Sequence, residues 1–465
     1  MTLYAHQLAA VNFLAQRGFT GAIFADMGTG KTLMALEAYR RLKTQNPGIK
    51  MVVCAPLSLL EAAWGLDIRQ FTAFSYYNAH DKPIPEVLKE DILLINYDAV
   101  ITKRAGPLAT IIKGNLLVTD ESSRMKNNQA KTTKIMLALG KLAKYRIVMT
   151  GTPAPNSPVE YWGQVEFLKP RYLHPSGSFY AFRNSYFHLQ RGRQIMQGKM
   201  VTKMALYDAF RTGFKYEITQ NNLERLMAKI NPLAFRIRKE ECLDLPEQVD
   251  EVRYVYLGIK TLKHYKEMKN DLITEIKRET ITAEMALTKI LKLREVCSGF
   301  LINSAGENIE IGSHEKLIEL LATIEELGNQ PLIIWCCFKY EIQKIQKELE
   351  KIYGLKSCVC LYSETKNRDQ AIDDFKNSRV RFAIAHSASI GHGVTFINCS
   401  NEIFYSIDYS WERWIQAKAR IHRIGQTKKC SYIHLLAKGT IEEDIYKVLQ
   451  EKGKMTDILE KLLKA

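Results

Sequence analysis

Residues 21–32 read GAIFADMGTGKT, a short apolar run followed by a loop that contains two glycines. The run at 21–25 has the length and apolar character of a buried strand. The segment after the loop, KTLMALEAYRRL (31–42), has the pattern of an amphipathic helix. A strand, a glycine-bearing loop and a helix in this order predict the first unit of a parallel α/β sheet.

Four further apolar runs follow in the first third of the chain. They are MVVCAP (51–56), DILLIN (91–96), NLLVTD (115–120) and YRIVMT (145–150). Helical patterns lie between them. Because fully apolar strands alternate with amphipathic helices, we predict a parallel sheet that is covered by helices on both faces.

The rest of the chain predicts a helical segment and then a second α/β block. Residues 170 to about 325 are mostly helical in pattern and rich in lysine and arginine. We therefore predict a first lobe at 1–169, a helical insert at 170–325 and a second lobe at 326–465, braced by an amphipathic C-terminal stretch. The strand candidates of the second lobe are PLIIWCC (331–337), LKSCVCLY (355–362), VRFAIAH (380–386), EIFYSI (402–407) and CSYIHLL (430–436).

The composition is that of a globular protein with a large positive charge. Of 465 residues, 46% are hydrophobic, and 66 Lys and Arg against 50 Asp and Glu give a formal charge of +16. Such a surplus favours a polyanionic partner, usually nucleic acid, and general solubility is the alternative reading. No apolar run is long enough to cross a bilayer, and the N-terminus lacks the pattern of a signal peptide. We expect neither membrane insertion nor export.

The nine cysteines are scattered and include no CxxC pair, and the ten histidines form no cluster with metal-ligand spacing. This pattern predicts reduced, mostly buried thiols. We expect neither a zinc site nor a disulfide framework.

The loop between the strand candidate at 21–25 and the helix candidate that begins at Lys31 has the chemistry of a phosphate-binding loop. Backbone N–H groups of such a loop can close around a phosphate, and the N-terminus of the following helix adds its dipole. Lys31 would neutralise the β- and γ-phosphates, and the Thr32 hydroxyl would ligate Mg²⁺. Ala25 stands where the pattern usually has glycine, which loosens the match. The residues expected to line the nucleotide are Met27, Gly28, Thr29 and Gly30.

A carboxylate pair and a small-residue turn end two other strands of the first block. Asp120 and Glu121 stand at the carboxyl edge of a parallel sheet, where α/β folds bind ligands. Asp120 can hold Mg²⁺ through water, and Glu121 can orient or deprotonate an attacking water. The turn Thr150-Gly151-Thr152-Pro153 stands at the end of the strand candidate YRIVMT (145–150). Its small residues allow close backbone approach, and its hydroxyls can bond to a neighbouring carboxylate or to a phosphate. An ordinary turn is the alternative for this second motif.

Gln416, Arg420 and Arg423 have the spacing of one helix face in WIQAKARIHRIGQ (414–426). Two guanidinium groups that project together form either a solvated basic face or an arginine finger. An arginine finger supplies charge to the γ-phosphate as it leaves. Because this motif belongs to the second block, it suggests a nucleotide held between two lobes.

The order of these motifs resembles that of superfamily-two helicases and, within them, the Swi/Snf family of ATP-driven DNA translocases. The resemblance runs from about residue 3 to about residue 450. Its most specific pieces are RMKN (124–127), RIRKEECLDLPEQ (236–248) and HRIGQTKK (422–429). It implies two RecA-like lobes with helical protrusions between them. It also implies ATP hydrolysis coupled to tracking along duplex DNA, usually without strand separation.

The resemblance also assigns roles to single residues. It gives Gln7 to adenine recognition, and it completes the ATP site from the second lobe with Gly393, Gln416, Arg420 and Arg423. Segments that usually approach the DNA backbone contain Pro56, Ser58, Lys126, Asn127, Thr150, Gly151 and Thr395. Contacts of these segments to phosphates would carry no sequence information.

The chain departs from the family pattern near the carboxylates. Ser122 and Ser123 stand where alanine and histidine are usual, and that histidine often couples the ATP site to the DNA-facing motifs. His6 stands where tyrosine is common. None of these departures removes a phosphate or Mg²⁺ ligand, so they bear on coupling more than on hydrolysis.

We therefore expect a monomeric, Mg²⁺-dependent, DNA-stimulated ATPase that translocates on double-stranded DNA. It resembles a stripped-down motor of bacterial or phage kind, located in the cytoplasm or on the nucleoid, and in the nucleus only in a eukaryote. One alternative is a strand-separating or fork-remodelling helicase that acts on forked or branched DNA. The others are a non-hydrolysing nucleic-acid clamp and a small-molecule P-loop kinase.

Overall fold

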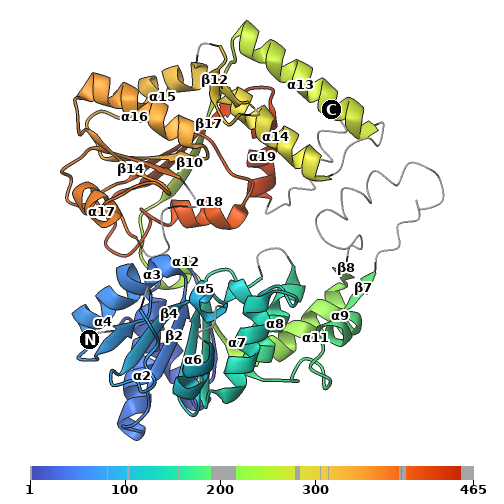
Figure 1. Ribbon diagram of the computed structural model, residues 1–465, viewed down its shortest axis with the longest axis vertical. Helices are drawn as coiled ribbons and strands as arrows, with labels where there is room; N and C mark the ends of the chain where they lie inside the picture. Colours follow the sequence, from blue (N-terminus) through green and yellow to red (C-terminus); the bar gives the residue numbers. More distant parts are fainter. Residues whose placement is uncertain are drawn as a thin grey trace. The chain divides into compact units, whose positions relative to one another are not determined.

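The computed structural model describes residues 3–80, 82–101, 105–154, 157–189, 216–277, 283–303, 305–312, 314–386, 389 and 394–451. The chain forms two compact units and passes from the first to the second between Leu245 and Pro246 (Figure 1). Each unit has its own parallel sheet. This confirms the predicted fold class of two parallel-sheet lobes with helices.

The first unit is built on a seven-stranded parallel sheet with the order β3-β4-β2-β5-β6-β1-β9. The five strands predicted for this lobe are confirmed to within one residue at each end. Two strands were not predicted, β3 and β9. The strands are β1 (Gly21–Ala25), β2 (Met51–Ala55), β3 (Tyr76–Asn78), β4 (Ile92–Asn96), β5 (Leu116–Asp120), β6 (Tyr145–Thr150) and β9 (Ala234–Ile237).

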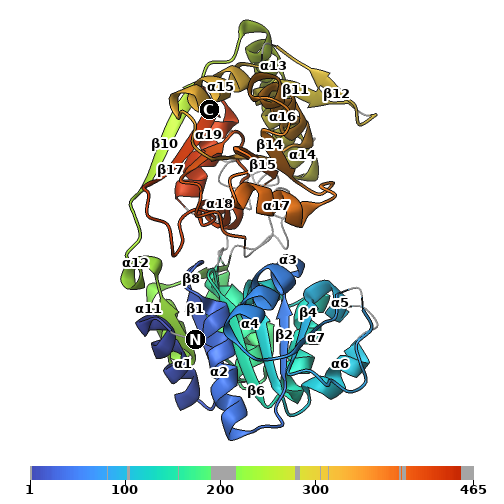
Figure 2. The same cartoon turned by 90° about the vertical axis from the view of Figure 1, so that its left-hand side faces the viewer.

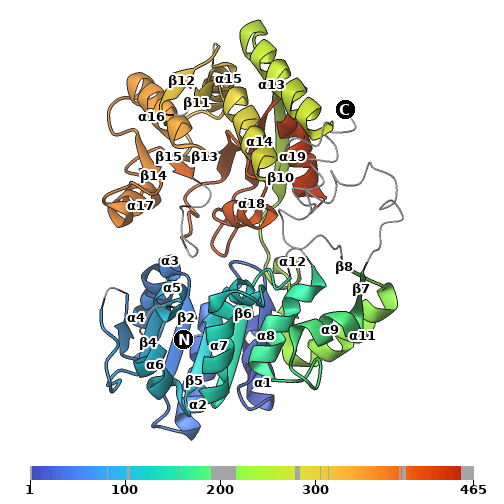
Figure 3. The same cartoon turned by 45° about the vertical axis from the view of Figure 1, so that its right-hand side comes forward.

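Both faces of this sheet are buried, because successive side chains of a strand point to opposite faces. In β1, Ala22 and Phe24 join one apolar core, and Ile23 and Ala25 join the other. The core that contains Ile23 is covered by α1 (Ala5–Gln16), α2 (Lys31–Gln45), α3 (Leu57–Leu59), the π-helix η1 (Leu60–Gly65) and α4 (Leu66–Phe71); Figure 2 shows α1, α2, α3 and α4. The opposite core is covered by α5 (Tyr97–Ile101), α6 (Ala105–Ile112), α7 (Lys131–Leu142), α8 (Tyr161–Leu168), α9 (Phe179–Tyr186) and α11 (Gln220–Ile230) (Figure 3).

The second unit has a six-stranded parallel sheet with the order β10-β17-β16-β13-β15-β14. The five strands predicted for this lobe are present, and β10 was not predicted. The strands are β10 (Gln248–Val255), β13 (Leu332–Cys336), β14 (Cys358–Leu361), β15 (Phe382–His386), β16 (Asn401–Phe404) and β17 (Cys430–Ala437).

Helices cover this second sheet as well. On one face, α15 (Glu315–Glu326) and α16 (Lys339–Tyr353) share an apolar core with alternate residues of β13, β15, β16 and β17. Two further helices, α13 (Ile259–Lys277) and α14 (Ala283–Cys297), pack side by side (Figure 3). The remaining helices are α17 (Arg368–Lys376), α18 (Trp411–Lys418) and α19 (Ile441–Gln450). α19 packs on β17 and α14, and the C-terminal stretch from 452, which belongs to the expected brace, lies outside the described residues.

The expected helical insert, 170–325, also contributes a strand to each sheet. β9 pairs with β1, and β10 pairs with β17, with α12 (Lys239–Cys242) between them. Both are edge strands, and polar residues on an edge strand hide the apolar pattern. Arg236 of β9, for example, packs its guanidinium over the rings of Phe24 and Tyr161. Short strand pairs β7 (Phe187–Leu189) with β8 (Tyr216–Ile218) and β11 (Phe300–Ile302) with β12 (Asn308–Glu310) complete the segment.

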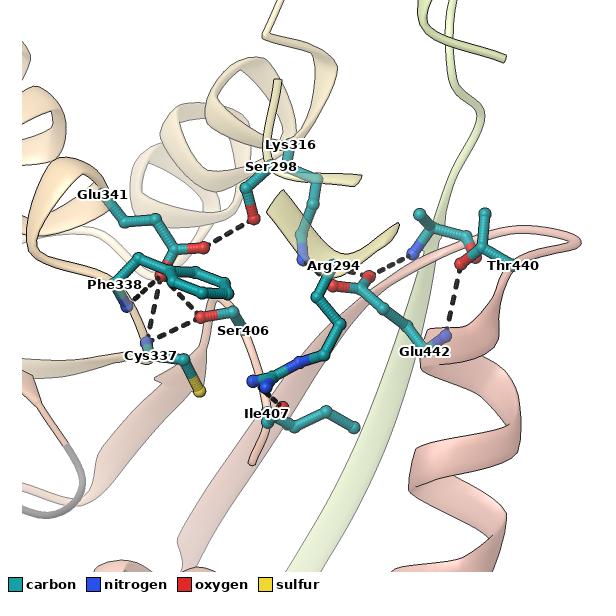
Figure 4. Close-up of polar contacts among 11 residues, drawn as sticks. Arg294, Ser298, Lys316, Cys337, Phe338, Glu341, Ser406, Ile407, Thr440 and Glu442 are labelled. Atoms are coloured by element: carbon teal, nitrogen blue, oxygen red, sulfur yellow. Dashed lines mark hydrogen bonds and ion pairs between the residues drawn. The ribbon is translucent and has the colours of Figure 1, made fainter. Parts of the chain in front are cut away.

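A buried ion pair fastens α19 to α15 in the second unit (Figure 4). Lys316 Nζ lies 2.7 Å from Glu442 Oε1, and the two side chains are 1% and 2% exposed. Glu442 Oε2 also accepts the Ala437 N–H at 2.8 Å. The carboxylate therefore has both a cation and a backbone donor, which a charge needs when it leaves water.

A second carboxylate in the same view fastens α14 to the sheet. Glu341 accepts hydrogen bonds from the Ser298 hydroxyl at 2.5 Å and the Ser406 hydroxyl at 2.6 Å. It also accepts the backbone N–H of Cys337. Arg294 of α14 donates to the Ile407 carbonyl at 2.6 Å (Figure 4). These contacts hold α14 against the carboxyl ends of β13 and β16.

All nine cysteines are free thiols, and six of them are buried. Within the described residues, no three His, Cys, Asp or Glu side chains gather as a set of metal ligands. No helix in the described part of the chain combines the length and apolar character needed to cross a lipid bilayer.

Candidate nucleotide-binding site

Three neighbouring strands of the first sheet bring the predicted site residues together. β5, β6 and β1 are adjacent, and in their register Asp120 pairs with Met149 and Phe24 pairs with Thr150. All three strands are parallel, so their carboxyl ends lie at one edge of the sheet. That edge therefore carries the loop before Lys31, the carboxylate pair and the turn that begins at Thr150.

The loop between β1 and α2 is shaped by two glycines. Gly28 and Gly30 have φ values of 87° and 83°, a left-handed conformation that glycine adopts without strain. The Thr29 hydroxyl donates to the Asp26 carbonyl at 2.8 Å. Lys31 Nζ donates to the Ala25 carbonyl at 2.9 Å and to the Asp26 carbonyl at 3.3 Å. The lysine ammonium group thus lies within the curve of the loop, where a phosphate would meet it.

The start of α1 packs directly against this loop. Gln7 Nε2 donates to the Thr29 carbonyl at 3.1 Å, and His6 Nε2 lies 2.9 Å from the same oxygen. Gln7 Oε1 accepts the Tyr4 N–H at 3.0 Å. A Cβ atom on Gly30 would overlap the Gln7 amide nitrogen. Gln7 therefore supports the loop, while its role in adenine recognition stays a prediction.

The loop is also held by the last residue of β9 and the first residue of α12, contacts that the sequence did not reveal. The Asp26 N–H donates to the Ile237 carbonyl at 3.2 Å. The Asp26 carboxylate accepts the Lys239 N–H at 3.0 Å. Residues more than 200 positions away in the sequence thus fix the start of the loop between β1 and α2.

Asp120 is buried, 5% exposed, and each of its oxygens accepts one hydrogen bond. Oδ2 accepts the indole N–H of Trp64 at 2.9 Å, and Oδ1 accepts the Glu121 N–H at 3.0 Å. Burial, together with the neighbouring Glu121 charge, raises the pKa of Asp120 to about 6. The charge of Lys31 and the Trp64 hydrogen bond act in the opposite direction. A bound cation would favour the ionised carboxylate in the same way as Lys31.

Glu121 has a left-handed backbone, with φ 51°, which is unusual for a residue other than glycine. Residues held in such sparsely populated backbone conformations cluster at functional sites. Glu121 Oε2 accepts the Thr150 hydroxyl at 3.1 Å, and the Thr150 oxygen in turn accepts the Thr152 N–H at 3.1 Å. The turn after β6 thus orients the second carboxylate. A bond from a hydroxyl of this turn to a neighbouring carboxylate was one of the two expectations, and a bond to a phosphate was the other.

Ser122 and Ser123, which stand where the resemblance leads us to expect alanine and histidine, are both buried. They open the 3₁₀ turn η2 (Ser122–Met125). The Ser122 hydroxyl donates to Gln164 Oε1 at 2.8 Å, and Gln164 Nε2 donates to the Pro153 carbonyl at 2.5 Å. Gln164, on α8, therefore bridges the segments that follow β5 and β6. Neither this bridge nor the Trp64 contact was predicted, because a partner on a distant helix leaves no local pattern.

The donor set fits Mg²⁺, which prefers oxygen ligands and keeps several waters or phosphate oxygens. Asp120 offers a carboxylate at the edge of the sheet, and Thr32 offers a hydroxyl in the first turn of α2. The few protein ligands agree with a cation that is held partly by nucleotide phosphates.

Gln416, Arg420 and Arg423, the residues predicted to share one helix face in the second lobe, do not lie on a single helix. The prediction of one helix through 416, 420 and 423 is wrong, because α18 ends at Lys418. The chain then turns, and the Arg420 carbonyl accepts the Phe396 N–H at 2.9 Å. Arg420 is only 2% exposed. Arg423 is half-buried and donates to the Ala419 carbonyl at 2.7 Å and the Thr395 hydroxyl at 3.0 Å.

The remaining predicted residues are distributed as follows. Gln416 is buried on α18, and its amide lies 3.5 Å from Glu412 Oε1. Pro56 is the residue before α3 and directly follows β2, the neighbour of β5. Gly393 lies outside the described residues. Half-buried positions are occupied by Ser58, Lys126, Asn127, Gly151 and Thr395.

Two family profiles match the chain. The profile of the SNF2-related domain matches residues 6–299. The profile of the helicase conserved C-terminal domain matches residues 313–425. The first match alone covers more than half of the chain.

Several known proteins are similar over nearly the whole chain. Protein p41 of Acyrthosiphon pisum secondary endosymbiont phage 1 is 24% identical and aligns over 95% of this chain and 94% of its own length. The SWI/SNF chromatin-remodelling complex subunit snf22 of Schizosaccharomyces pombe is 24% identical over 97% of this chain, which spans 27% of snf22. An uncharacterised ATP-dependent helicase of Mycoplasma genitalium is 25% identical over 96% of this chain, which spans 40% of that protein.

Among solved structures, the Sulfolobus solfataricus SWI2/SNF2 ATPase core in complex with dsDNA is 25% identical. Its TM-score is 0.46, and the alignment covers 97% of this chain and 91% of that one.

Proposed function

Because the chain belongs to the SNF2-related family, we propose that it is an ATP-dependent motor that moves along double-stranded DNA. Family membership makes it an enzyme of the helicase type that uses ATP. The observation that carries the proposal is the edge formed by β1, β6 and β5. There the phosphate loop with Lys31 stands beside Asp120 and Glu121, and Thr150 holds the second carboxylate.

Each of these groups has a distinct task in ATP hydrolysis. Lys31 and the loop amides would bind the phosphates of ATP, and Thr32 and Asp120 would hold Mg²⁺. Mg²⁺, when bound, neutralises charge on the phosphates. Glu121, oriented by the Thr150 hydroxyl, would direct a water toward the γ-phosphate. Arg420 and Arg423 remain candidates for charge stabilisation at the γ-phosphate.

Duplex DNA as the polymer is supported by the charge of +16 and by family membership. The candidate DNA contacts follow strands of the same edge: Pro56 and Ser58 come after β2, and Lys126 and Asn127 come after β5 and η2. Because the ATP site and these segments start from neighbouring strands, a change at one can reach the other over a short path.

The proposal is tested by the steady-state rate of ATP hydrolysis without polymer and with single-stranded DNA, blunt duplex DNA, forked DNA or RNA, at two salt concentrations. We expect strong stimulation by blunt duplex that weakens as salt rises, because phosphate contacts release counterions. Stimulation by single strands or forks alone would favour the strand-separating alternative. No hydrolysis with any polymer would favour the non-hydrolysing clamp and overturn the proposed motor.

Substitutions separate the roles within the site. Lys31→Ala should nearly abolish turnover, whereas Glu121→Gln should retain ATP binding and block hydrolysis. Lys339→Ala, in an exposed ion pair with Glu364 of the second unit, serves as the charge-matched control and should hydrolyse ATP normally. Full activity of Glu121→Gln would exclude the water-directing role.

The candidate arginine finger needs its own variant. Arg423→Ala should lower kcat far more than it lowers nucleotide affinity, as expected for a group that acts on the transition state. A variant that loses affinity and keeps kcat would contradict this role.

A further inference from the structure

Trp64 connects two parts of the first unit that the sequence presents as separate. It lies in η1, which directly follows α3, the helix that begins after Pro56 and carries Ser58. Its indole N–H donates to Asp120 Oδ2 at 2.9 Å, and its side chain is fully buried. The candidate DNA-facing segment is therefore bonded, through one side chain, to the candidate Mg²⁺-facing carboxylate.

The chemistry of this donor suits a carboxylate that must also bind a cation. An indole N–H donates one hydrogen bond and cannot accept one, so it fixes the carboxylate as the acceptor. It carries no charge, so the negative charge of Asp120 stays available to Mg²⁺. A lysine or arginine at this place would neutralise that charge. With one N–H donor on each oxygen, Asp120 keeps unused lone pairs, because a carboxylate has about four acceptor sites.

The segment that carries Trp64 is not an ordinary helix. Residues 60–65 form a π-helix between α3 and α4, and π-helical turns are rare and concentrate at functional sites. Trp64 packs in the same apolar core as Met34 of α2 and Val118 of β5. Because that core is close-packed, a shift of η1 is passed on to its neighbours and is not absorbed locally.

We propose that Trp64 is a positioning residue: it holds the Asp120 carboxylate for Mg²⁺ and thereby couples the DNA-facing segment 56–65 to the ATP site. This rests on the proposed function, since it assumes that the segment meets DNA and that the site binds ATP. Trp64 does not touch the reacting atoms, and its effect is exerted through Asp120.

The test replaces Trp64 in the full chain by phenylalanine and, where that variant fails to fold, by benzothienylalanine, which keeps the indole shape and lacks the N–H. Trp162→Phe is the matched control, because Trp162 is buried in the opposite core of the same unit. Calorimetry measures the affinity for ADP once with Mg²⁺ and once with a chelator that removes Mg²⁺. The ratio of the two affinities is the gain in ADP affinity due to Mg²⁺, and it is obtained without any turnover. ATPase rates with and without blunt duplex DNA give the fold stimulation.

For Trp64→Phe we expect the Mg²⁺-dependent gain in ADP affinity to fall about tenfold, the size of effect seen when a group that supports a metal ligand is removed. The stimulation by duplex DNA should fall with it, while ADP affinity in chelator and both values for Trp162→Phe stay at wild-type level. If Trp64→Phe changes only the Mg²⁺-dependent gain or only the stimulation by duplex DNA, or changes neither, the proposal is overturned. A wild-type chain that duplex DNA does not stimulate overturns the proposed function instead, and the calorimetric ratio still decides whether Trp64 positions Asp120.

Discussion

The Thr150 hydroxyl makes two hydrogen bonds at the end of β6, one to the Glu121 carboxylate and one from the Thr152 N–H. Replacing Thr150 by valine keeps the shape of the side chain and removes both bonds. We expect kcat for ATP hydrolysis to fall about ten- to hundredfold, since a hydrogen bond to a charged group contributes roughly 1.5–3 kcal/mol. Nucleotide affinity should change little. Steady-state kinetics and equilibrium nucleotide binding measure the two effects.

Thr133→Val is the matched control for this prediction. Thr133 is fully buried on α7, and its hydroxyl has no hydrogen-bond partner among the described residues. Its loss should leave kcat within about twofold, because no charged group depends on it. Equal losses in the two variants would mean that Thr150 acts through packing and not through Glu121.

Glu402 of β16 is a fully buried carboxyl that the proposed chemistry does not use. Burial raises its pKa from an ordinary value of 4.5 to about 8, although the Trp335 indole, Lys418 and Arg420 oppose the shift. Because the folded pKa lies above the unfolded pKa, the group's contribution to stability is complete below about pH 4.5. That contribution is lost as pH rises toward about 8, at up to about 1.4 kcal/mol per pH unit.

Glu402→Gln should therefore flatten the pH dependence of the free energy of unfolding between pH 5 and pH 8. It should also make the chain more stable than wild type above pH 8, because glutamine mimics the protonated acid. Unfolding curves at several pH values measure this, with the exposed Glu364→Gln as the control. Parallel pH profiles for Glu402→Gln and wild type would contradict the assignment.

At the scale of elements, the pair of Lys316 and Glu442 joins α15 to α19 in the second unit. Glu442→Ala leaves a buried ammonium group without its partner, which costs about 3–5 kcal/mol of unfolding free energy. The double replacement Lys316→Met with Glu442→Leu should recover most of this loss, because no charge remains to be desolvated. Denaturant unfolding measures both variants.

The matched control is the exposed pair of Lys339 and Glu364, whose side chains are 51% and 56% exposed. Glu364→Ala should change the free energy of unfolding by less than about 1 kcal/mol, since water already solvates both groups. A small loss for Glu442→Ala would mean that α19 is held by its apolar face alone.

At the scale of the whole molecule, two fragments test whether the first unit needs the segment that ends at residue 245. A fragment of residues 1–245 retains β9 beside β1 and the backbone contacts of Ile237 and Lys239 with Asp26. A fragment of residues 1–169 loses them and exposes the edge of β1. We expect 1–245 to bind ATP as a soluble protein and 1–169 to bind weakly and aggregate, because an exposed apolar strand edge pairs with other chains. Equal nucleotide affinity of soluble fragments would show that β9 is dispensable.

The sequence by itself determined the ten apolar strands, their parallel arrangement and the chemistry of the loop before Lys31. Buried parallel strands need apolar side chains on both faces, so each produces a continuous run that is visible in the chain. The candidate phosphate loop is equally local, because its glycines, its lysine and its helix follow one another directly. The carboxylate pair is recognised in the same way, since Asp120 and Glu121 end such a run.

Only the tertiary structure decided which residues support that chemistry. The order of β5, β6 and β1 brings Thr150 to Glu121, and the packing of η1 brings Trp64 to Asp120. It also showed that the edge strands β9 and β10 come from the segment predicted as helical, and that α18 ends before Arg420. These contacts join residues far apart in the chain. Hydrogen bonds between distant side chains and the pairing of polar edge strands impose no periodicity on the sequence, so no local pattern predicts them.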